Sequence, residues 1–478
     1  MRRKFNLGQD MTKGNPLQLI IQFTIPMLLG NIFQQFYSMA DTYIVSQTLG
    51  VEAFTAVGAT GSITFLILGL AAGLTAGLSV VTAQHFGKKD YQGLRRSLAA
   101  SMIISTVVAL LLTIFATRYT REILVFMKTP ASLIDDAHAY LVVIFSGTAA
   151  SVFYNLLSNI MRAIGDSKTP LIFLAVASVV NIILDYVFIL VFHTGVEGAG
   201  YATIFSQIIA TIFCFLYIYK KIPILRIHKE DWKLTRKEIT HHLQIGLPMG
   251  FQSSIIALGT MSIQVTLNGL GATAVAATTA AEKINGIATM PLQSFGITMA
   301  TYTAQNFGAG KLDRIWDGVQ KITRVVLIYS FVMGTALIFF GRKFATIFVS
   351  SENHAILNHV ETYFITNATF YFLLAMLFIY RYTLQGLGKS TAPTAAGIME
   401  LLSRIIAAIV LSKSFGYFGI SLAGPLAWLG ALIPLMGSYY LTKRSLTKDI
   451  PTQTVDEKKS FFPYPLHSLS KLLPKFAK

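Results

Sequence analysis

Apolar runs long enough to cross a lipid bilayer dominate this sequence and recur twelve times between clusters of Gly, Pro and charged residues. A membrane-spanning helix needs about 20 consecutive, mostly apolar residues. The chain is 53% hydrophobic and 13% charged, which is roughly half the charged fraction of a soluble protein. We therefore expect an all-α polytopic membrane protein with twelve transmembrane helices. The spans are predicted near residues 16–46, 52–86, 95–117, 134–161, 170–192, 198–219, 243–269, 274–307, 317–340, 358–386, 392–412 and 417–441.

The excess of basic residues follows this topology. The chain has 39 Lys and Arg residues against 22 Asp and Glu, a net charge of +17. With a cytoplasmic N-terminus, and with charges at loop margins included, 31 of the 39 basic residues fall in cytoplasmic segments and 6 in outside segments. This asymmetry is the positive-inside rule. We expect a multi-pass protein of the cell membrane with both termini in the cytoplasm, and no binding to nucleic acid.

Short motifs in the first half of the chain return in the second half at a nearly constant offset of 221 to 223 residues. The matches are "TAQHFGKK" at 82–89 with "TAQNFGAG" at 303–310, "IGDSKTP" at 164–170 with "LGKSTAP" at 387–393, and "IPM" at 25–27 with "LPM" at 247–249. Three matches in the same order indicate a duplication. Each half holds an even number of spans, so both copies enter the membrane in the same orientation.

The duplication predicts two six-helix bundles related by a pseudo-two-fold axis along the membrane normal. We expect an N-terminal bundle at 1–219, a charged cytoplasmic linker at 220–241, a C-terminal bundle at 242–442 and a basic cytoplasmic tail at 443–478. Two facing bundles around a central site are typical of alternating-access transport, although a duplicated scaffold without transport would share the pattern.

Few ionisable side chains lie well inside the predicted spans, where they are costly and mark function by default. They are Asp41, Asp185, Glu282, Lys283, Glu400 and Arg404. Glu400 and Arg404 are four residues apart on one helix face, which predicts a structural ion pair. Asp41 and Asp185 have no base beside them.

The two aspartates have polar neighbours of their own. Asn181 precedes Asp185 by one helical turn, and Tyr37 and Gln34 precede Asp41 by one and two turns. With Thr203 of the next span, these groups predict one polar surface that takes up a proton or a Na⁺ ion. The alternative is that each acid only forms hydrogen bonds between helices.

The sequence contains neither a GxxxxGK[ST] phosphate-binding loop nor an HExxH metal motif. Asp41 and Asp185 also lack the GxGD turn of membrane aspartyl proteases. We expect no catalytic activity and no cofactor, with H⁺ or Na⁺ as the coupling ion.

Several motifs together resemble the prokaryotic multidrug and toxic compound extrusion (MATE) family. They are "TAQHFGKKD", "RAIGDSKTP", "NIILD" and "GAGYATIFSQ", in order along twelve spans in two repeated halves. The resemblance covers about residues 10 to 445 and is nearest to the branch named after DNA-damage-inducible protein F. It implies a transporter that exports organic, often lipophilic cations against an inward H⁺ or Na⁺ gradient.

The resemblance also implies roles for individual residues. Those for the coupling cation are Asp41, Asn181, Asp185, Thr203 and Tyr140, of which Asp41, Asn181, Asp185 and Thr203 would hold the metal ion if the cation is Na⁺. Pro26 matches the proline at which the first helix bends. Gln34, Asn155 and Asn159 fall where relatives contact drug, and we group Tyr37 with them. The seventh span, "GLPMGFQSSIIALG", lacks the glutamate of the NorM branch, so coupling is expected in the first half.

We therefore expect a monomeric secondary multidrug antiporter that works by alternating access, embedded in membrane lipid and acting on small cationic drugs. A flippase for lipid-linked oligosaccharide or another lipid, from the same superfamily, is the alternative. The sequence leaves open whether H⁺ or Na⁺ is coupled, which conformation is lowest in energy, and what Glu282, Glu400, Arg404 and the tail do.

Overall fold

The computed structural model describes residues 9–127 and 129–448, and these residues form helices and connecting turns with no strand. The chain divides into two compact units, Met1–Tyr439 and Tyr440–Lys478. The description below concerns the first unit, together with the bounds of the last helix. Most of the predicted basic tail lies outside the described residues.

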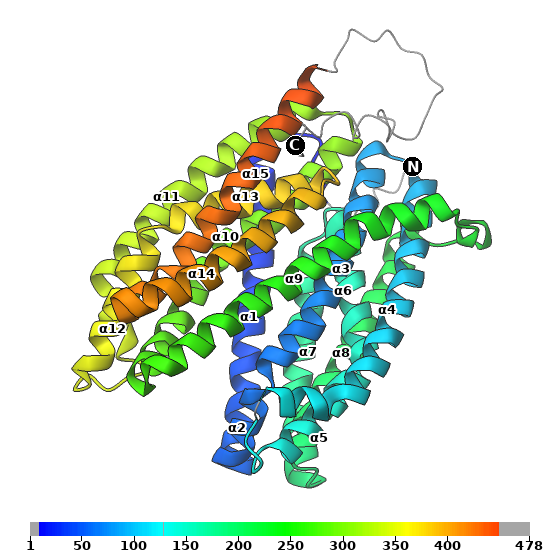
Figure 1. Cartoon of the computed structure of the whole chain (residues 1–478). Coiled ribbons are helices and arrows are strands. Elements are labelled where there is room, and N and C mark those ends of the chain that lie inside the picture. Colours follow the sequence, from blue (N-terminus) through cyan, green and yellow to red (C-terminus); the bar gives the residue numbers. More distant parts are fainter. Residues whose placement is uncertain (1–8, 128, 449–478) are drawn as a thin grey trace, which may run out of the picture. The chain divides into compact units, whose positions relative to one another are not determined.

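The first half of the chain forms eight α-helices (Figure 1). They are α1 (Pro16–Leu49), α2 (Val51–Ala59), α3 (Gly61–Lys88), α4 (Tyr91–Phe126), α5 (Ile134–Ser146), α6 (Thr148–Ala163), α7 (Lys168–Tyr186) and α8 (Val196–Lys221). A short π-helix, η1 (Val187–Val191), extends α7.

A linker with two 3₁₀ turns, η2 (Pro223–Leu225) and η3 (Lys229–Trp232), leads to the second half, which forms seven α-helices. They are α9 (Arg236–Leu270), α10 (Ala272–Gly308), α11 (Leu312–Ala345), α12 (His354–Ala368), α13 (Tyr371–Gly386), α14 (Thr391–Ser421) and α15 (Ala423–Lys448).

These helices account for the predicted spans. By length and apolar composition, seven helices of the described residues can each cross a membrane, and the pairs α5–α6 and α12–α13, each bent by 48°, bring the number to nine. The other three predicted spans fall on α9, α10 and α15, of 35, 37 and 26 residues. A helix of 26 residues is about 39 Å long, enough for a hydrocarbon core of about 30 Å. The all-α membrane fold is thus confirmed.

Two boundaries differ from the prediction. The second predicted span divides at Thr60 into α2 and α3. The last predicted span begins at residue 417, but α14 continues to Ser421 across a kink at Gly416, whose φ is +55°. Glycine adopts this left-handed conformation without steric cost, so an apolar run that looks continuous is broken there.

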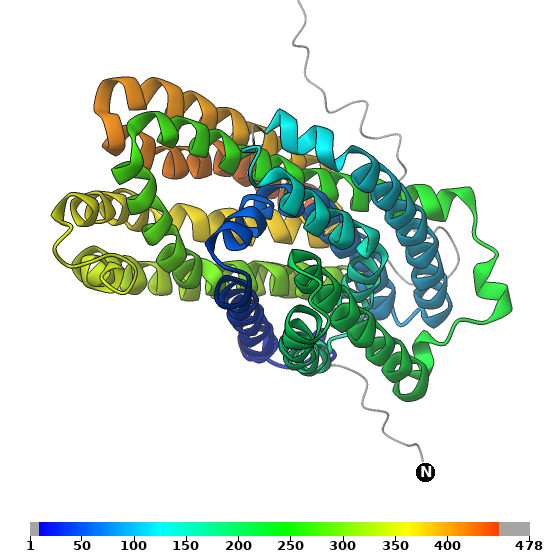
Figure 2. The same ribbon diagram turned by 90° about the horizontal axis from the view of Figure 1, so that it is seen from below.

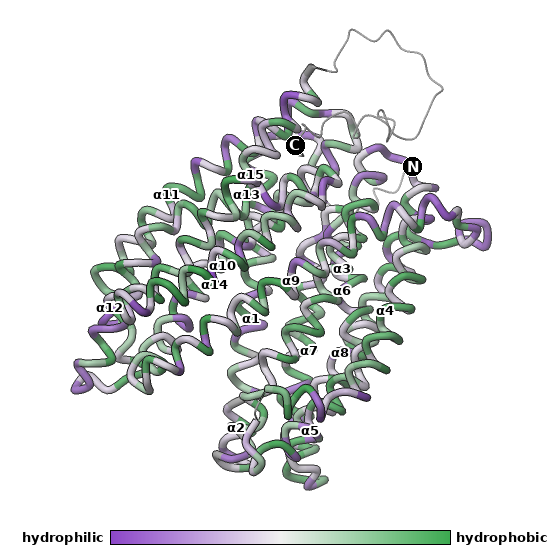
Figure 3. The backbone as a smooth tube through the Cα atoms, viewed as in Figure 1, coloured by the Kyte–Doolittle hydropathy of each residue, from purple (hydrophilic) through white to green (hydrophobic). Residues whose placement is uncertain are grey.

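Hydrophobic residues cover the bodies of the helices, and hydrophilic residues gather at their ends and in the linker (Figure 3). Many large apolar side chains are exposed on the outer faces of the helices, among them Leu110, Phe331 and Phe339. In water such exposure would be unfavourable, but lipid chains satisfy it. The outer faces are therefore those of a membrane protein.

The repeated motifs meet at the end of the first unit where α3 and α10 terminate. Gln84 Nε2 donates to the Gly386 carbonyl at 3.0 Å, and Gln305 Nε2 donates to the Ala163 carbonyl at 2.8 Å. Gln84 and Gln305 are equivalent in the duplication, as are Ala163 and Gly386. We call this region, defined by Gln84 and Gln305, the joined end.

The joined end is closely packed. A Cβ atom on Gly87 would lie 1.9 Å from the Gln305 carbonyl oxygen, and one on Gly308 would lie 1.9 Å from the Gln84 carbonyl oxygen. The duplication therefore appears in three dimensions as paired, reciprocal contacts between the two halves. The exact division into bundles at 1–219 and 242–442 stays a prediction.

Candidate functional site

Asp41 of α1 and Asp185 of α7 bring their carboxyl groups within interaction range of each other. Asp185 and Asn181 are fully buried, and Asp41 is half-buried. Asn181 and Asp185 share one face of α7 because they are four residues apart. Of the residues in the predicted polar surface, Asp41, Asn181 and Asp185 thus lie together between α1 and α7.

This surface is rich in hydrogen-bond acceptors and short of donors. Among the described residues, no N–H or hydroxyl group donates to Oδ1 of Asp41, to either carboxyl oxygen of Asp185, or to Oδ1 of Asn181, and all four atoms are buried. The two carboxyl groups act as hydrogen-bond partners of each other. Buried acceptors without partners are costly, and two carboxylates side by side repel each other. The arrangement is satisfied when a proton or a cation lies between these oxygens.

The ligands that this surface offers to a cation are all oxygen atoms. Two carboxylates, an amide oxygen and a hydroxyl are hard oxygen ligands. No group of three or more His, Cys, Asp or Glu side chains that could hold a metal ion occurs in the parts of the chain that are described. That the cation is H⁺ or Na⁺ stays a prediction.

Thr203 and Tyr140 complete the surroundings of the aspartates. Asn181 Nδ2 donates to Thr203 Oγ1 of α8 at 3.5 Å. Tyr140 of α5 is buried in an apolar cluster with Ile44 and Val45, which lie one turn beyond Asp41 on α1. All five predicted coupling residues therefore belong to adjoining parts of α1, α5, α7 and α8.

A π-helix begins directly after this site. Residues Val187–Val191 follow the last turn of α7, two residues beyond Asp185. Such widened turns are rare and occur frequently at functional sites. The sequence offered no recognisable signal for this one.

The hydrogen bonds of the residues predicted to contact drug do not link these residues to one another. Asn155 Nδ2 donates to the Ser151 carbonyl of its own helix at 2.8 Å, and Asn159 Nδ2 donates to Thr75 Oγ1 of α3 at 3.3 Å. Gln34 is exposed. The side chain of Tyr37 lies outside the described structure, although its backbone belongs to α1. The assignment of these four residues stays a prediction.

Helix α1 connects the two halves of the chain. Thr24 and Asn31 form hydrogen bonds with Thr298 and Ser294 of α10, at 2.8 and 3.1 Å. The later part of α1 packs against α7, and Figure 2 shows α1, in dark blue, between helices of both halves. Pro26 lies inside α1 between the two contacts with α10. A bend at Pro26 would therefore change how α1 sits against both halves.

The charges of the second half are organised differently. Glu400 accepts hydrogen bonds from Arg404 Nη2 at 2.9 Å and from Arg381 Nη2 of α13 at 2.6 Å. The predicted ion pair of Glu400 and Arg404 is confirmed. Arg381 lies near the end of the tenth predicted span and was therefore counted with the cytoplasmic charges. The structure instead buries it inside α13. Its carboxylate partner is 19 residues away, a separation from which no helix periodicity predicts contact.

Ion pairs also join the two halves near the joined end. Arg95 and Arg96, at the start of α4, bind Asp231 at 2.9 Å and Glu238 at 2.6 Å. The hydrogen bond from Arg96, assisted by hydrogen bonds from Thr235, lowers the pKa of Glu238 to about 2. These residues were missed because they look like ordinary loop charges.

Comparison with known proteins shows which proteins the chain is similar to. The family model MatE matches the chain twice, over residues 26–187 and 248–410, which agrees with the duplication. The probable multidrug resistance protein YpnP of Bacillus subtilis is 29% identical over 72% of this chain and 77% of its own length. The probable multidrug resistance protein YoeA of the same species is 25% identical over 92% of this chain and 97% of its own length.

A solved structure has the same fold. The outward-facing conformation of a multidrug resistance MATE family transporter of the MOP superfamily aligns over 93% of this chain and 100% of that chain, with a TM-score of 0.85 and 23% identity. At this identity the likeness concerns the fold alone. The two family-model matches together cover more than half of the residues, and the chain therefore belongs to the MatE family.

Proposed function

We propose that this protein is a secondary active multidrug efflux transporter that exports small organic cations in exchange for H⁺ or Na⁺ by alternating access. The observation that carries the proposal is the donor-poor pair of carboxyl groups at Asp41 and Asp185. The names of YpnP and YoeA, which refer to multidrug resistance, support export of drugs by a relative of this chain.

The proposed orientation follows from the charges. The joined end lies beside Arg95, Arg96 and the basic linker, and the positive-inside rule assigns such an end to the cytoplasm. Both termini are then cytoplasmic, and the described arrangement is closed toward the cytoplasm. The protein acts as a monomer in the plasma membrane under this proposal.

The coupling step follows from the position of α1. A cation that binds between Asp41 and Asp185 removes the repulsion between the carboxylates and draws α1 toward α7. Because α1 also contacts α10 through Thr24 and Asn31, this movement changes the surface that α1 presents to cargo. An ion drives transport only to the extent that it binds the two conformations unequally, and a site on the bridging helix meets that condition.

The flippase alternative is less well supported. A flippase for lipid pyrophosphates needs bases that are free to bind phosphate. The structure adds Arg381 to the interior, but Arg381 and Arg404 both bind Glu400. Lys283, which has no ion pair within 4.0 Å among the described residues, is a single positive charge against a doubly charged pyrophosphate. The first half meanwhile presents two carboxyl groups, which suits a cationic cargo.

The test is ethidium efflux from cells of a pump-deficient host that expresses the chain. The wild-type protein should lower ethidium accumulation, and Asp41→Asn at equal membrane expression should abolish the effect. Glu52→Gln, an exposed acid on α2, is the control and should behave as wild type. Full efflux by the Asp41→Asn protein would contradict the assignment of the coupling site.

A further inference from the structure

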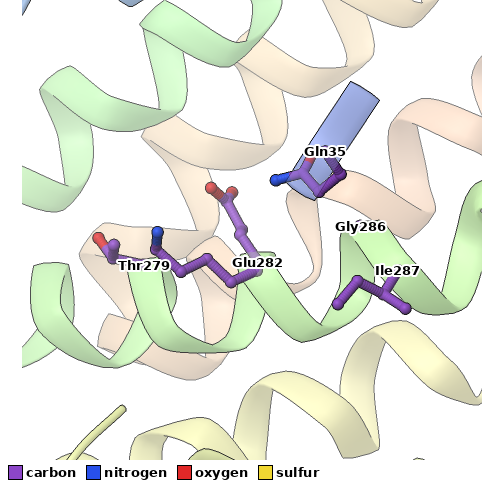
Figure 4. A pocket seen from close by; sticks show the side chains of 6 residues that line it. Gln35, Thr279, Glu282, Gly286 and Ile287 are labelled. Atoms are coloured by element: carbon purple, nitrogen blue, oxygen red, sulfur yellow. The ribbon is translucent and has the colours of Figure 1, made fainter. Parts of the chain in front are cut away.

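A cavity of about 300 Å³ lies between α1 and α10, away from the Asp41 site. It is lined by Gln35 of α1 and by Thr279, Glu282, Lys283, Gly286 and Ile287 of α10. Figure 4 shows the side chains of Glu282 and Gln35 pointing toward each other across it. A volume of this size is at the lower end of the range for small-molecule sites.

The cavity places two opposite charges deep in the membrane. Glu282 is ten residues from the start of α10, which corresponds to about 15 Å along the helix, or about half the hydrocarbon core. Both Glu282 and Lys283 are exposed to the space around them. Charges at this depth are tolerated where they face water or a polar ligand rather than lipid.

Neither charge has an ion-pair partner in contact with it among the described residues, and the Arg404 guanidinium acts on Glu282 only from beyond contact distance. Among the residues described, no ion pair within 4.0 Å involves Glu282 or Lys283. Glu400, the other acid that lies well inside a predicted span of this half, is bound by two arginines, and both arginines are occupied by it. As neighbours along the helix, Glu282 and Lys283 point about 100° apart and do not face each other. They remain available to a ligand.

We propose that this cavity is a subsite for zwitterionic drugs, in which Glu282 binds the ammonium group and Lys283 binds the carboxylate group of one molecule. The Gln35 amide and the Thr279 hydroxyl supply polar contacts beside the charges. A ligand with only a positive charge would satisfy Glu282 and leave Lys283 beside it as a like charge. This subsite rests on the proposed function and specifies its substrate class.

The subsite is connected to the coupling site through α1. Gln35 lies six residues before Asp41 on the same helix, so a ligand in the cavity touches the helix that moves when the cation binds. Movement of α1 toward α7 withdraws Gln35 from α10 and loosens the subsite. Cation binding and retention of the zwitterion thus oppose each other, as antiport requires.

The test is a binding cycle with the purified full-length protein. The ligands are norfloxacin, which carries a carboxylate and a protonated amine near neutral pH, and its ethyl ester, which lacks the carboxylate. A charge-assisted hydrogen bond contributes enough for a loss of about tenfold or more. Lys283→Met should raise the Kd for norfloxacin at least tenfold and leave the Kd for the ester unchanged or lower it, because a like charge beside the ester's ammonium group is removed. Glu282→Gln should weaken the binding of both ligands.

The controls address folding and location. Lys413→Met removes an exposed lysine from α14 and should leave both affinities unchanged. Lys283→Arg should restore norfloxacin binding, which a merely misfolded variant would not show. As an independent readout, norfloxacin should slow maleimide labelling of Gln35→Cys, since the one native cysteine, Cys214, is buried.

The outcomes separate this inference from the proposed function. Equal effects of Lys283→Met on norfloxacin and its ester, or no effect on either, would overturn the zwitterion subsite while wild-type ethidium efflux still supports the transporter. If the wild-type protein neither binds norfloxacin nor exports ethidium, both proposals fail.

Discussion

Replacing Gly87 with alanine should weaken the contact that holds the two halves together at the joined end. The added Cβ would lie 1.9 Å from the carbonyl oxygen of Gln305 and 2.6 Å from its carbonyl carbon. Ordinary contact begins at about 3.4 Å, so the backbones of α3 and α10 must separate by about 1.5 Å at this point. Backbone atoms cannot rotate away as a flexible side chain can.

The cost can be derived from the same contacts. Overpacking of this kind costs about 1–3 kcal/mol. If the helices instead separate, the hydrogen bonds of Gln84 and Gln305, 3.0 and 2.8 Å long, exceed hydrogen-bond range, at about 1 kcal/mol each. Either way the joined arrangement loses about 2 kcal/mol, which changes its equilibrium with the separated arrangement about thirtyfold.

The assay uses a cysteine at Ala83, a buried position in the apolar cluster at the joined end. Maleimide should label Ala83→Cys slowly in the otherwise native protein and up to about thirtyfold faster when Gly87→Ala is also present. Gly437→Ala is the matched control, because its Cβ would meet nothing within 4 Å. Unchanged labelling in the Gly87→Ala protein, with equal amounts of folded protein, would refute the role given to this contact.

Three further predictions concern the hinge, the second half and the linker. Pro26→Ala restores a helix hydrogen bond in α1 and should reduce ethidium efflux severalfold while leaving norfloxacin binding intact, as measured by transport and binding on one preparation. Glu400→Gln leaves two buried arginines without a carboxylate and should cost about 3–5 kcal/mol, seen as a lowered Tm that the exposed Glu122→Gln does not share. The pKa of Glu238, lowered from 4.5 to about 2 by Arg96, means that this pair stabilises the fold above pH 4.5 and loses the effect as the pH falls toward 2. The difference in Tm between wild type and Glu238→Gln should therefore stay constant from pH 7 to 5 and shrink below; a difference that falls already between pH 7 and 5 would contradict this.

The sequence predicts features that depend on local periodicity. Apolar runs of bilayer length locate the helices, and repeated motifs reveal the duplication. Asp41 and Asp185 could be recognised because an acid without a base is conspicuous in an apolar run. Glu400 and Arg404 could be paired because they are one helical turn apart.

Features that depend on contacts between distant residues could not be predicted. The repeated "TAQ" motif signals a duplication, but nothing in it states that Gln84 and Gln305 bind the opposite half. Arg381 looks like a loop charge until the packing of α13 against Glu400 is known. The break at Gly416 is hidden because a single glycine in an apolar run is compatible with a continuous helix.

The most direct test of the coupling site is substrate flux in proteoliposomes under a pH gradient and a Na⁺ gradient, each imposed alone, for wild type and Asp185→Asn. We predict that at least one gradient drives ethidium transport by the wild-type protein and that neither gradient drives it in Asp185→Asn at equal amounts of folded protein. Gradient-driven transport by Asp185→Asn at the wild-type rate would contradict the claim that the Asp41 and Asp185 carboxyl groups take up the coupling ion.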